Sequence, residues 1–232
     1  MLENMAAGGN VLGSTFEDLR DTIALIQNKQ RVGVCLDTCH AFAAGYDLRS
    51  PETFRATMRH FDEVVGMKYL QAVHINDSKA PFASHKDLHA NIGTGFLGLR
   101  AFHNLVNDSR FEGLPLILET PLDMTDEYGK PVKDEKGKNQ EAKSIWSTEI
   151  KLLESLVGMD VEGEEFLRSE AVLAQKGEPE RKRLEDMVER KKLKDEKKAK
   201  SPKKGKGKGK KKKAESEDES ELSELESDNA RE

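Results

Sequence analysis

The sequence predicts an α/β fold built on a parallel β-sheet, and two patterns lead to this prediction. Three short apolar segments are bounded by turn residues and are nearly continuous in apolarity, as strands covered on both faces are. These segments are RVGVCLD (31–37), YLQAVHIND (69–77) and LPLILET (114–120). Longer segments lie between them, with apolar residues at i, i+3 and i+4. Such alternation is typical of βαβ units, which form a parallel barrel or a doubly wound sheet.

The helical pattern occurs in four segments, residues 15–28, 50–66, 97–111 and 145–158. The second begins with SPETF, in which Ser50 can cap the helix and Pro51 fits its first turn. A long polar loop over residues 122–144 precedes the last helix and is predicted to be an exposed insertion.

Charge divides the chain into three parts. Residues 1–176 carry a net charge of −8, residues 177–213 carry +11, and residues 214–232 carry −8. We predict a folded domain over residues 1–160 and a charged low-complexity tail over 161–232, basic and then acidic. From about Gly177 the apolar surface is too small for folding alone, so disorder is expected. A charged helix over 179–198 fits the charge spacing, without an apolar stripe wide enough to dock.

The sequence predicts no membrane span and no secretory signal peptide. Its apolar runs fall short of the roughly 20 residues that a membrane span needs. The N-terminal MLENMAAGG lacks the pattern of a signal peptide. At the rise of roughly 3.3 Å per residue in a strand, Cys35 and Cys39 would lie about 13 Å apart, too far for a disulfide. A soluble, reduced, intracellular protein is therefore expected.

Metal-binding residue types stand at or near the ends of predicted strands, at Glu3, Asp37, His74 and Glu119. Their separations of 34, 37 and 45 residues are each about the length of one βα unit. The C-terminal ends of parallel strands share one face of a barrel or a doubly wound sheet, and active sites form there. We expect these four side chains to converge on one metal ion.

A second group follows two of these strands. His40 stands just past the Asp37 strand, and Asp87 and His89 lie in the loop HKDLHANIG (85–93). Alternate residues of an extended loop point the same way, so Asp87 and His89 can bind one ion with His40 as the third ligand. Three protein ligands leave a coordination position open, as catalytic zinc sites do.

These residue types also have structural interpretations. A carboxylate at a strand end often caps a helix, and a histidine beside a strand is often a hydrogen-bonded structural residue. We interpret Cys35 and Cys39 as core-filling residues. Asn76 and Asp77 are interpreted as caps of the following turn rather than as substrate contacts. The other histidines are predicted to lie at the surface: His60, His85 and His103.

Five segments, in this order, resemble the endonuclease IV family of abasic-site endonucleases. They are LENMAAGGNVLG (2–13), GVCLDTCHAFAAGYD (33–47), HINDSK (74–79), DLHANIGTG (87–95) and LILETP (116–121). The segment IWSTEIKLLESL (145–156) is similar to the closing helix of that family. The charged tail lies outside the resemblance.

The resemblance implies a TIM-type (β/α) barrel with three zinc ions. The implied reaction is hydrolysis of the phosphodiester 5′ to an apurinic or apyrimidinic site in double-stranded DNA, as in base excision repair. Glu3 and Glu119 would be the catalytic carboxylates, and Glu3 would bridge to the first zinc. The second zinc would be held by Glu3, Asp37, His74 and Glu119, and the third by His40, Asp87 and His89.

The chain departs from this family in its extent. The matching part is roughly 160 residues, whereas a whole barrel takes about 250. We therefore expect the C-terminal half of the barrel, in a truncated form of the enzyme. Two histidines that complete the first zinc site belong to the earlier half. Met5 stands where the family usually has Thr.

Two other functions remain open. A sugar isomerase on a related barrel also binds divalent metals at strand ends, although the trio His40, Asp87 and His89 argues against it. A catalytically inactive fragment could instead bind nucleic acid or chromatin. The segment SPKKGKGKGKKKK (201–213) resembles a nuclear import signal, and it could contact DNA phosphates or the import machinery. We expect the protein in the nucleus, with the mitochondrion as an alternative.

Overall fold

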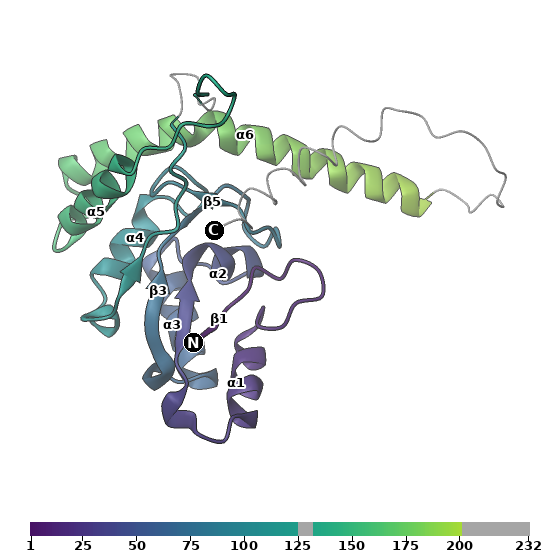
Figure 1. Ribbon diagram of the computed structural model, residues 1–232, viewed down its shortest axis with the longest axis vertical. Helices are drawn as coiled ribbons and strands as arrows, with labels where there is room; N and C mark the ends of the chain where they lie inside the picture. The colour runs from purple at the N-terminus through teal and green to yellow at the C-terminus, as the bar shows by residue number, and fades with distance from the viewer. Residues whose placement is uncertain (125–131, 201–232) are drawn as a thin grey trace.

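The computed structural model describes residues 1–124 and 132–200, and its centre is a parallel sheet of four strands (Figure 1). The strands are Leu2–Glu3 (β1), Val34–Asp37 (β2), Leu70–His74 (β3) and Leu116–Ile117 (β6). They lie side by side in chain order, β1-β2-β3-β6, as consecutive strands of a TIM-type barrel do. The predicted α/β fold with a parallel sheet is confirmed.

The four predicted helices are present, with shorter bounds. They are Phe16–Leu25 (α1), Pro51–Val64 (α3), Leu99–Val106 (α4) and Ser144–Leu156 (α5). Short 3-10 turns occupy Lys29–Arg31, Met67–Tyr69 and Ser109–Phe111. Ser50 caps α3 with Pro51 in its first turn, as predicted. The helices pack against one another in chain order, α1 on α3, α3 on α4, and α4 on α5.

Strand β2 lies at the centre of the core, and all four of its residues are buried. Large apolar side chains from the helices surround it, including Phe16, Phe61 and Phe102. The continuous apolarity of this segment therefore reflects a strand covered on both faces. By contrast, Leu116 and Ile117 of β6 are 40% and 41% exposed, because β6 is an edge strand of the described sheet.

The register of the sheet places the strand ends along one edge. Asp37 pairs with His74, and each is the last residue of its strand. Glu3, the last residue of β1, pairs with Cys35. Side chains at the carboxyl ends of β1, β2 and β3 can therefore meet above this edge.

Two short elements were not predicted. Residues Thr38–Ala44 form a buried helix, α2, which Gly45 ends in the left-handed conformation at φ 107°. Residues Asp77–Ser78 (β4) and His89–Ala90 (β5) form a separate antiparallel pair. The predicted strand over 69–77 thus ends at His74, and β5 lies in a region that the sequence indicated as loop. Both elements lie next to predicted ligands, so they matter for the site.

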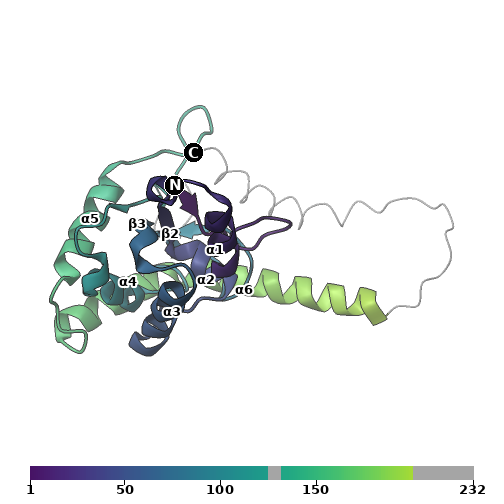
Figure 2. The same cartoon turned by 90° about the horizontal axis from the view of Figure 1, so that it is seen from below.

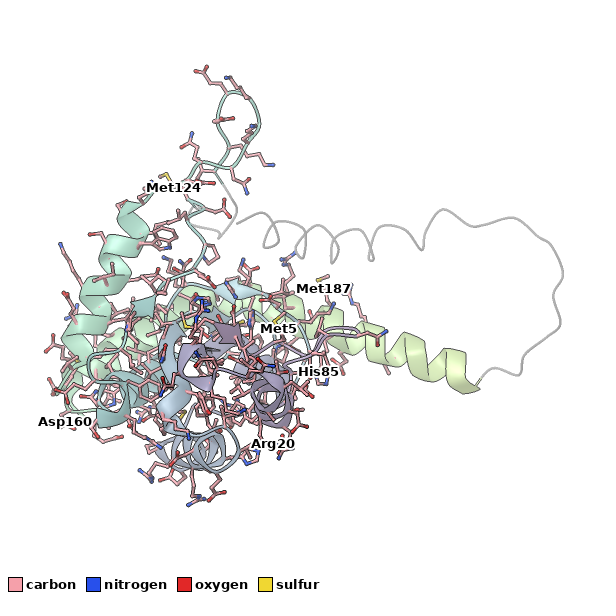
Figure 3. The ribbon with its side chains drawn as sticks, turned by 60° about the horizontal axis from the view of Figure 1, so that its bottom comes forward. Met5, Arg20, His85, Met124, Asp160 and Met187 are labelled. Atoms are coloured by element: carbon pink, nitrogen blue, oxygen red, sulfur yellow. The ribbon has the colours of Figure 1, made fainter. Side chains whose placement is uncertain are left out.

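The described residues of the insertion before α5, 122–124 and 132–144, are mostly exposed, as predicted, and they extend away from the body of the protein near Met124 (Figure 3). Its two arms meet in isolated antiparallel bridges, Asp123 with Glu141 and Lys133 with Asn139. Backbone hydrogen bonds from Met124 to Gln140 and from Ala142 to Leu122 close its base.

The folded part of the chain continues past the predicted boundary at residue 160. Residues Glu164–Lys200 form a single long helix, α6, which runs along the body and then extends beyond it (Figures 1 and 2). Phe166 is fully buried in the main core, and Leu184 is 2% exposed. The prediction of disorder from Gly177 is therefore wrong up to residue 200, because α6 finds an apolar partner surface on the barrel. The segment 201–232 lies outside the described residues.

A search of the described residues for membrane spans found no helix with the length and apolarity to cross a bilayer.

Candidate metal centre

The strand ends bring together the first predicted group, which we call the strand-end cluster: Glu3, Asp37, His74 and Glu119. His74 Nδ1 lies 3.0 Å from Glu3 Oε1 and 3.2 Å from Glu119 Oε2. It also lies 3.9 Å from Asp37 Oδ2. One ligand atom of each residue lies within 4.8 Å of those of the other three. All four could therefore bind the same ion.

The second predicted group also comes together, and we call it the loop cluster: His40, Asp87 and His89. Asp87 Oδ2 lies 3.0 Å from His40 Nε2, and Asp87 Oδ1 lies 3.2 Å from His89 Nε2. One carboxylate thus faces two imidazoles. The two clusters adjoin, because His40 Nδ1 is 3.4 Å from Glu3 Oε1 and His89 Nε2 is 4.0 Å from Asp37 Oδ2.

The two oxygens of Asp37 have different roles. Oδ1 accepts a hydrogen bond from the backbone N–H of His40 at 2.7 Å and so caps α2. Oδ2 accepts a hydrogen bond from the Asn76 side chain at 2.7 Å and faces the strand-end cluster. The capping interpretation and the ligand interpretation of this residue are therefore compatible.

Asn4 connects β1, β2 and α2. Its side chain accepts from Asp37 N at 2.7 Å and donates to Asp37 O at 3.1 Å. Its own carbonyl oxygen lies 2.9 Å from His40 Nδ1. Sequence reasoning named Asn4 only as part of a motif, because bonds across 33 residues leave no local signal.

The hydrogen bonds of the loop cluster fit a bound cation. His40 Nδ1 can donate to the Asn4 carbonyl, and His89 Nδ1 can donate to the Glu119 carbonyl at 3.0 Å. This arrangement leaves each Nε2 with a free lone pair, as in metal-ligating histidines. Both Nε2 atoms and Asp87 Oδ1 are buried, and the contacts of the two Nε2 atoms with the Asp87 carboxylate at 3.0 and 3.2 Å lack hydrogen-bond geometry. Buried polar atoms of this kind require compensation, and one cation between them would supply it.

Electrostatics also favour a cation in the strand-end cluster. Burial acts to raise the pKa of Glu3, but hydrogen bonds with His40 and His74 outweigh it and lower this pKa to about 2. Burial acts to lower the pKa of His40, but the charge of Asp37 and the contacts with Asp87 and Glu3 raise it to about 11. Without a metal, the imidazoles therefore hold protons that balance the carboxylates, and a divalent cation would displace those protons.

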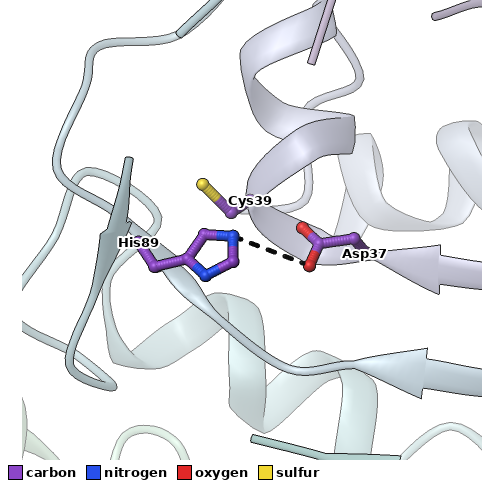
Figure 4. Close-up of side chains that lie close together, drawn as sticks. All are labelled: Asp37, Cys39 and His89. Atoms are coloured by element: carbon purple, nitrogen blue, oxygen red, sulfur yellow. Dashed lines mark ion pairs between the residues drawn. The ribbon is translucent and has the colours of Figure 1, made fainter. Parts of the chain in front are cut away.

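Cys39 lies beside Asp37 and His89, so it too could approach a metal (Figure 4). Its thiol is fully buried and can donate to the carbonyl oxygen of Leu88, with a sulfur–oxygen distance of 3.5 Å. Burial, with the negative charge of Asp37, raises the pKa of this thiol well above its usual value. A protonated thiol is a poor ligand. The geometry thus agrees with the interpretation of Cys39 as a core residue, and Cys35 is likewise free and buried.

Asn76 and Asp77 have different roles. Asp77 is fully buried and accepts hydrogen bonds from the backbone N–H groups of Gly95, Leu97 and Gly98. It therefore fixes a loop 18 to 21 residues further along the chain, rather than the turn that directly follows it. The capping prediction is wrong for Asn76. Its amide donates to Asp37 Oδ2 at 2.7 Å and to Glu119 Oε2 at 3.5 Å, and its oxygen accepts from Glu119 N. Asn76 therefore orients two carboxylates of the strand-end cluster.

The other histidines lie outside the clusters. His60 is partly exposed on α3, where it lies 3.8 Å from Glu17 and against the ring of Phe16. His103 is half-buried rather than superficial, because its Nε2 lies 2.8 Å from the Met159 carbonyl oxygen. His85 lies in the loop before Asp87 with a positive φ of 56° (Figure 3).

Helix α5 holds the chain next to Glu119. The buried carboxylate of Glu149 accepts from Thr120 Oγ1 and from Ile92 N. Trp146 Nε1 donates to the Thr120 carbonyl at 2.8 Å. The backbone on the C-terminal side of Glu119 is therefore fixed from a helix that begins beyond the insertion.

Comparisons with known proteins extend these observations. The family described as "Xylose isomerase-like TIM barrel" matches residues 1–155. Apurinic-apyrimidinic endonuclease 1 of Schizosaccharomyces pombe is 43% identical over 199 residues, which are 86% of this chain and 53% of that protein. The probable endonuclease 4 of Campylobacter curvus is 46% identical over 156 residues, which are 67% of this chain and 48% of that protein.

A solved structure shows the same likeness. The crystal structure of endonuclease IV from Thermus thermophilus matches with a TM-score of 0.53 and 28% identity, over 67% of this chain and 48% of that one. The present chain thus spans about half the length of the curated relatives it matches.

Replacement of Asn76 by Ala should weaken metal binding without removing any ligand. The carboxylates of Asp37 and Glu119 would lose the group that orients them, and such losses cost about ten- to a hundredfold in metal affinity. Competition with a chromophoric chelator measures this change. Asn104→Ala is the control, because the Asn104 amide also donates two hydrogen bonds, but to the backbone carbonyls of Leu48 and Arg49 and from α4. Equal affinities of the two variants would contradict the role given to Asn76.

Proposed function

This chain belongs to the xylose isomerase-like TIM barrel family and, within it, to the endonuclease IV enzymes, and we propose that the complete protein is a DNA-repair nuclease. The proposed reaction is hydrolysis of the phosphodiester 5′ to an abasic site in double-stranded DNA, as in base excision repair. The observation that carries this proposal is the pair of adjoining acid–histidine clusters at the strand ends. Adjacent metal sites of this kind suit a phosphodiester substrate.

We propose zinc as the metal of both clusters. Imidazole ligands suit zinc, whereas sites for Mg²⁺ or Mn²⁺ are built mainly from carboxylates and water. The loop cluster has two imidazoles and one carboxylate, and this composition favours the nuclease over a sugar isomerase. Bound zinc would offset phosphate charge, lower the pKa of a coordinated water and stabilise the departing oxygen.

The residues of the site divide by exposure. Asp37, His40 and His89 are buried and would hold metal. The side chains of Glu3 and Glu119 are 32% and 34% exposed, so they border the side from which a phosphate would approach. Asp87 of the loop cluster is more exposed, at 45%, so exposure alone does not select the catalytic residues. We assign the catalytic carboxylates to Glu3 and Glu119 from the resemblance to the endonuclease IV family. Glu3 would also contact the further zinc whose histidines, in the family, come from the other half of the barrel.

Zinc should be present in the folded protein when it is prepared without chelator. Asp37→Ala and His74→Ala should lower the zinc content most, because each removes a ligand at the end of a central strand. His60→Ala is the matched control, since His60 is exposed on α3 and outside both clusters. Elemental analysis gives the result. A folded preparation without zinc would refute the assignment of the metal.

Incision of DNA should require the complete barrel. The 232 residues, preceded by the other barrel half of the fission-yeast relative, should cut a duplex with one tetrahydrofuran abasic analogue, and the same residues alone should cut it far more slowly. Glu3 lies on the edge strand β1, which pairs only with β2 among the described strands, so it is weakly held without a neighbour. Cooperative unfolding of the fusion would show that its barrel is closed.

Glu119→Gln in the fusion is the control for chemistry, because it removes a charge and keeps the side-chain shape. Robust zinc-dependent cutting by the 232 residues alone, lost on Glu119→Gln, would show that the second half is dispensable. A third outcome would indicate a nucleic-acid-binding protein instead. In that case the fusion would not cut the duplex, and its DNA affinity would stay unchanged when Asp37 and His74 are replaced.

The charged tail is proposed to direct the protein to the nucleus and to add affinity for DNA phosphates or the import machinery. Deletion of residues 201–232 should lower nuclear accumulation, because it removes the lysine-rich segment SPKKGKGKGKKKK. The deletion begins at 201 so that α6 keeps its contacts with the barrel. Fluorescence microscopy of a tagged protein measures the distribution. An unaltered distribution would count against a nuclear signal, and mitochondrial accumulation would favour the alternative compartment.

A further inference from the structure

The loop that carries Asp87 and His89 has little support from the parallel sheet. Its only strand, β5, has two residues, and they pair with the two residues of β4. On its inner side, Glu149 Oε1 accepts from Ile92 N at 2.8 Å and from Asn91 Nδ2 at 3.2 Å. These contacts fix residues that follow His89. The carbonyl oxygen of Leu88 also accepts hydrogen bonds from Lys79 N at 2.8 Å and from the Cys39 thiol. These bonds hold the loop by its backbone, and the Leu88 side chain is held by contacts at the outer side.

Helix α6 covers that outer side, and Figure 1 shows it running past β5. Leu184 of α6 is 2% exposed and forms a buried cluster with Ala80 and Leu88. Met187 packs against the same cluster. Leu88 stands between the two ligands Asp87 and His89 in the chain. The apolar contact of Leu184 is thus made with the residue that connects two ligands of the loop cluster.

A second contact lies one turn before Leu184. Arg181 Nη1 donates to the carbonyl oxygen of Thr94 at 2.5 Å, and Nη2 donates to that of Ala174 at 2.7 Å. The second bond lies close to Pro179, which provides no N–H for the helix. Gly177 allows the close approach, because a Cβ there would overlap the Thr94 carbonyl. Hydrogen bonds from a guanidinium are stronger than neutral ones.

The first half of α6 is anchored on the barrel independently of the loop. Phe166 lies in the main core. Arg100 of α4 forms ion pairs with Glu170 at 2.9 Å and Glu162 at 3.0 Å. The helix begins at Glu164, beyond the residues 1–155 that match the barrel family. An element outside the family barrel thus reaches from the main core to the ligand loop.

We propose that α6 is a brace for the loop cluster, and that Leu184 and Arg181 are positioning residues which set the metal affinity of His40, Asp87 and His89. The inference rests on the proposed function for the identity of the metal. Ligand groups must be held within about 0.5 Å of their productive positions, and the packing behind them provides this restraint. The Asp87 side chain is 45% exposed, so few neighbours hold it directly. The contact between Leu184 and the adjacent residue Leu88 restrains the backbone that carries Asp87.

Zinc titration of the full 232-residue chain tests this proposal. Zinc is removed with chelator and added back in competition with a chromophoric chelator, and His89→Ala identifies the binding class that belongs to the loop cluster. Leu184→Ala should lower the zinc affinity of the loop cluster by about tenfold or more, as the loss of other residues that support metal ligands does. The zinc affinity of the strand-end cluster should stay unchanged. The separate variant Leu184→Met should keep most of the zinc affinity of the unaltered chain, because methionine can make the same apolar contact.

The control is Leu193→Ala, the same substitution on the same helix at a side chain that is 50% exposed. Arg181→Gln is a second variant, which keeps the apolar cluster intact. It should also weaken zinc binding at the loop cluster, and it provides the test if Leu184→Ala does not fold. Wild-type affinity in folded Leu184→Ala and Arg181→Gln would overturn the brace alone. Absence of a His89-dependent class in the unaltered chain would overturn the proposed metal site and the brace with it.

Discussion

The side chain of Asp37 is fully buried, and the ends of three strands depend on how its charge is satisfied. A buried carboxylate is tolerated only with hydrogen-bond or charge partners. Asn76 after β3 and the first turn of α2 donate hydrogen bonds to this carboxylate. Asn4 beside β1 bonds to the backbone N–H and carbonyl of the same residue and so holds it in place. Helix α2 in turn carries His40 to Asp87. The loop cluster therefore forms only where the strand-end cluster has formed.

The two clusters are supported in different ways. The strand-end cluster is held in place by the hydrogen bonds of the parallel sheet, because Asp37 and His74 are paired residues of neighbouring strands. The loop cluster stands on a short antiparallel ladder, with Glu149 on one side and α6 on the other. Variation outside the barrel can thus act on one metal position and spare the other. This separation allows the barrel to stay constant while affinity at its rim changes.

The members of the two clusters and the strands were predictable from the sequence because they depend on local pattern. Apolar runs that end in Asp37 or His74 place those residues at strand ends whatever the rest of the chain does. Helix α2 was missed because it is buried on nearly all sides and has no amphipathic period. The role of Asn76 depends on Glu119, which is 43 residues away.

The charged helix predicted over 179–198 is present within α6, but its start at Glu164 and its docking on the barrel were missed for a related reason. Its docking residues Phe166, Leu173 and Leu184 lie about two and three helical turns apart among charged residues, so the sequence shows no stripe. These residues are recognised as one face of the helix only from their contacts with the barrel. Long-range contacts of this kind are set by tertiary packing and not by the local period of the chain.

Trp146 is the single tryptophan of the chain, and its indole N–H donates to the carbonyl of Thr120, the residue after Glu119. Tryptophan emission from the protein therefore arises at one place, at the backbone that carries a proposed ligand. Any shift of Glu119 that lengthens this hydrogen bond changes the polarity around the indole. The protein thus contains its own optical reporter of the strand-end cluster, and an attached dye is unnecessary.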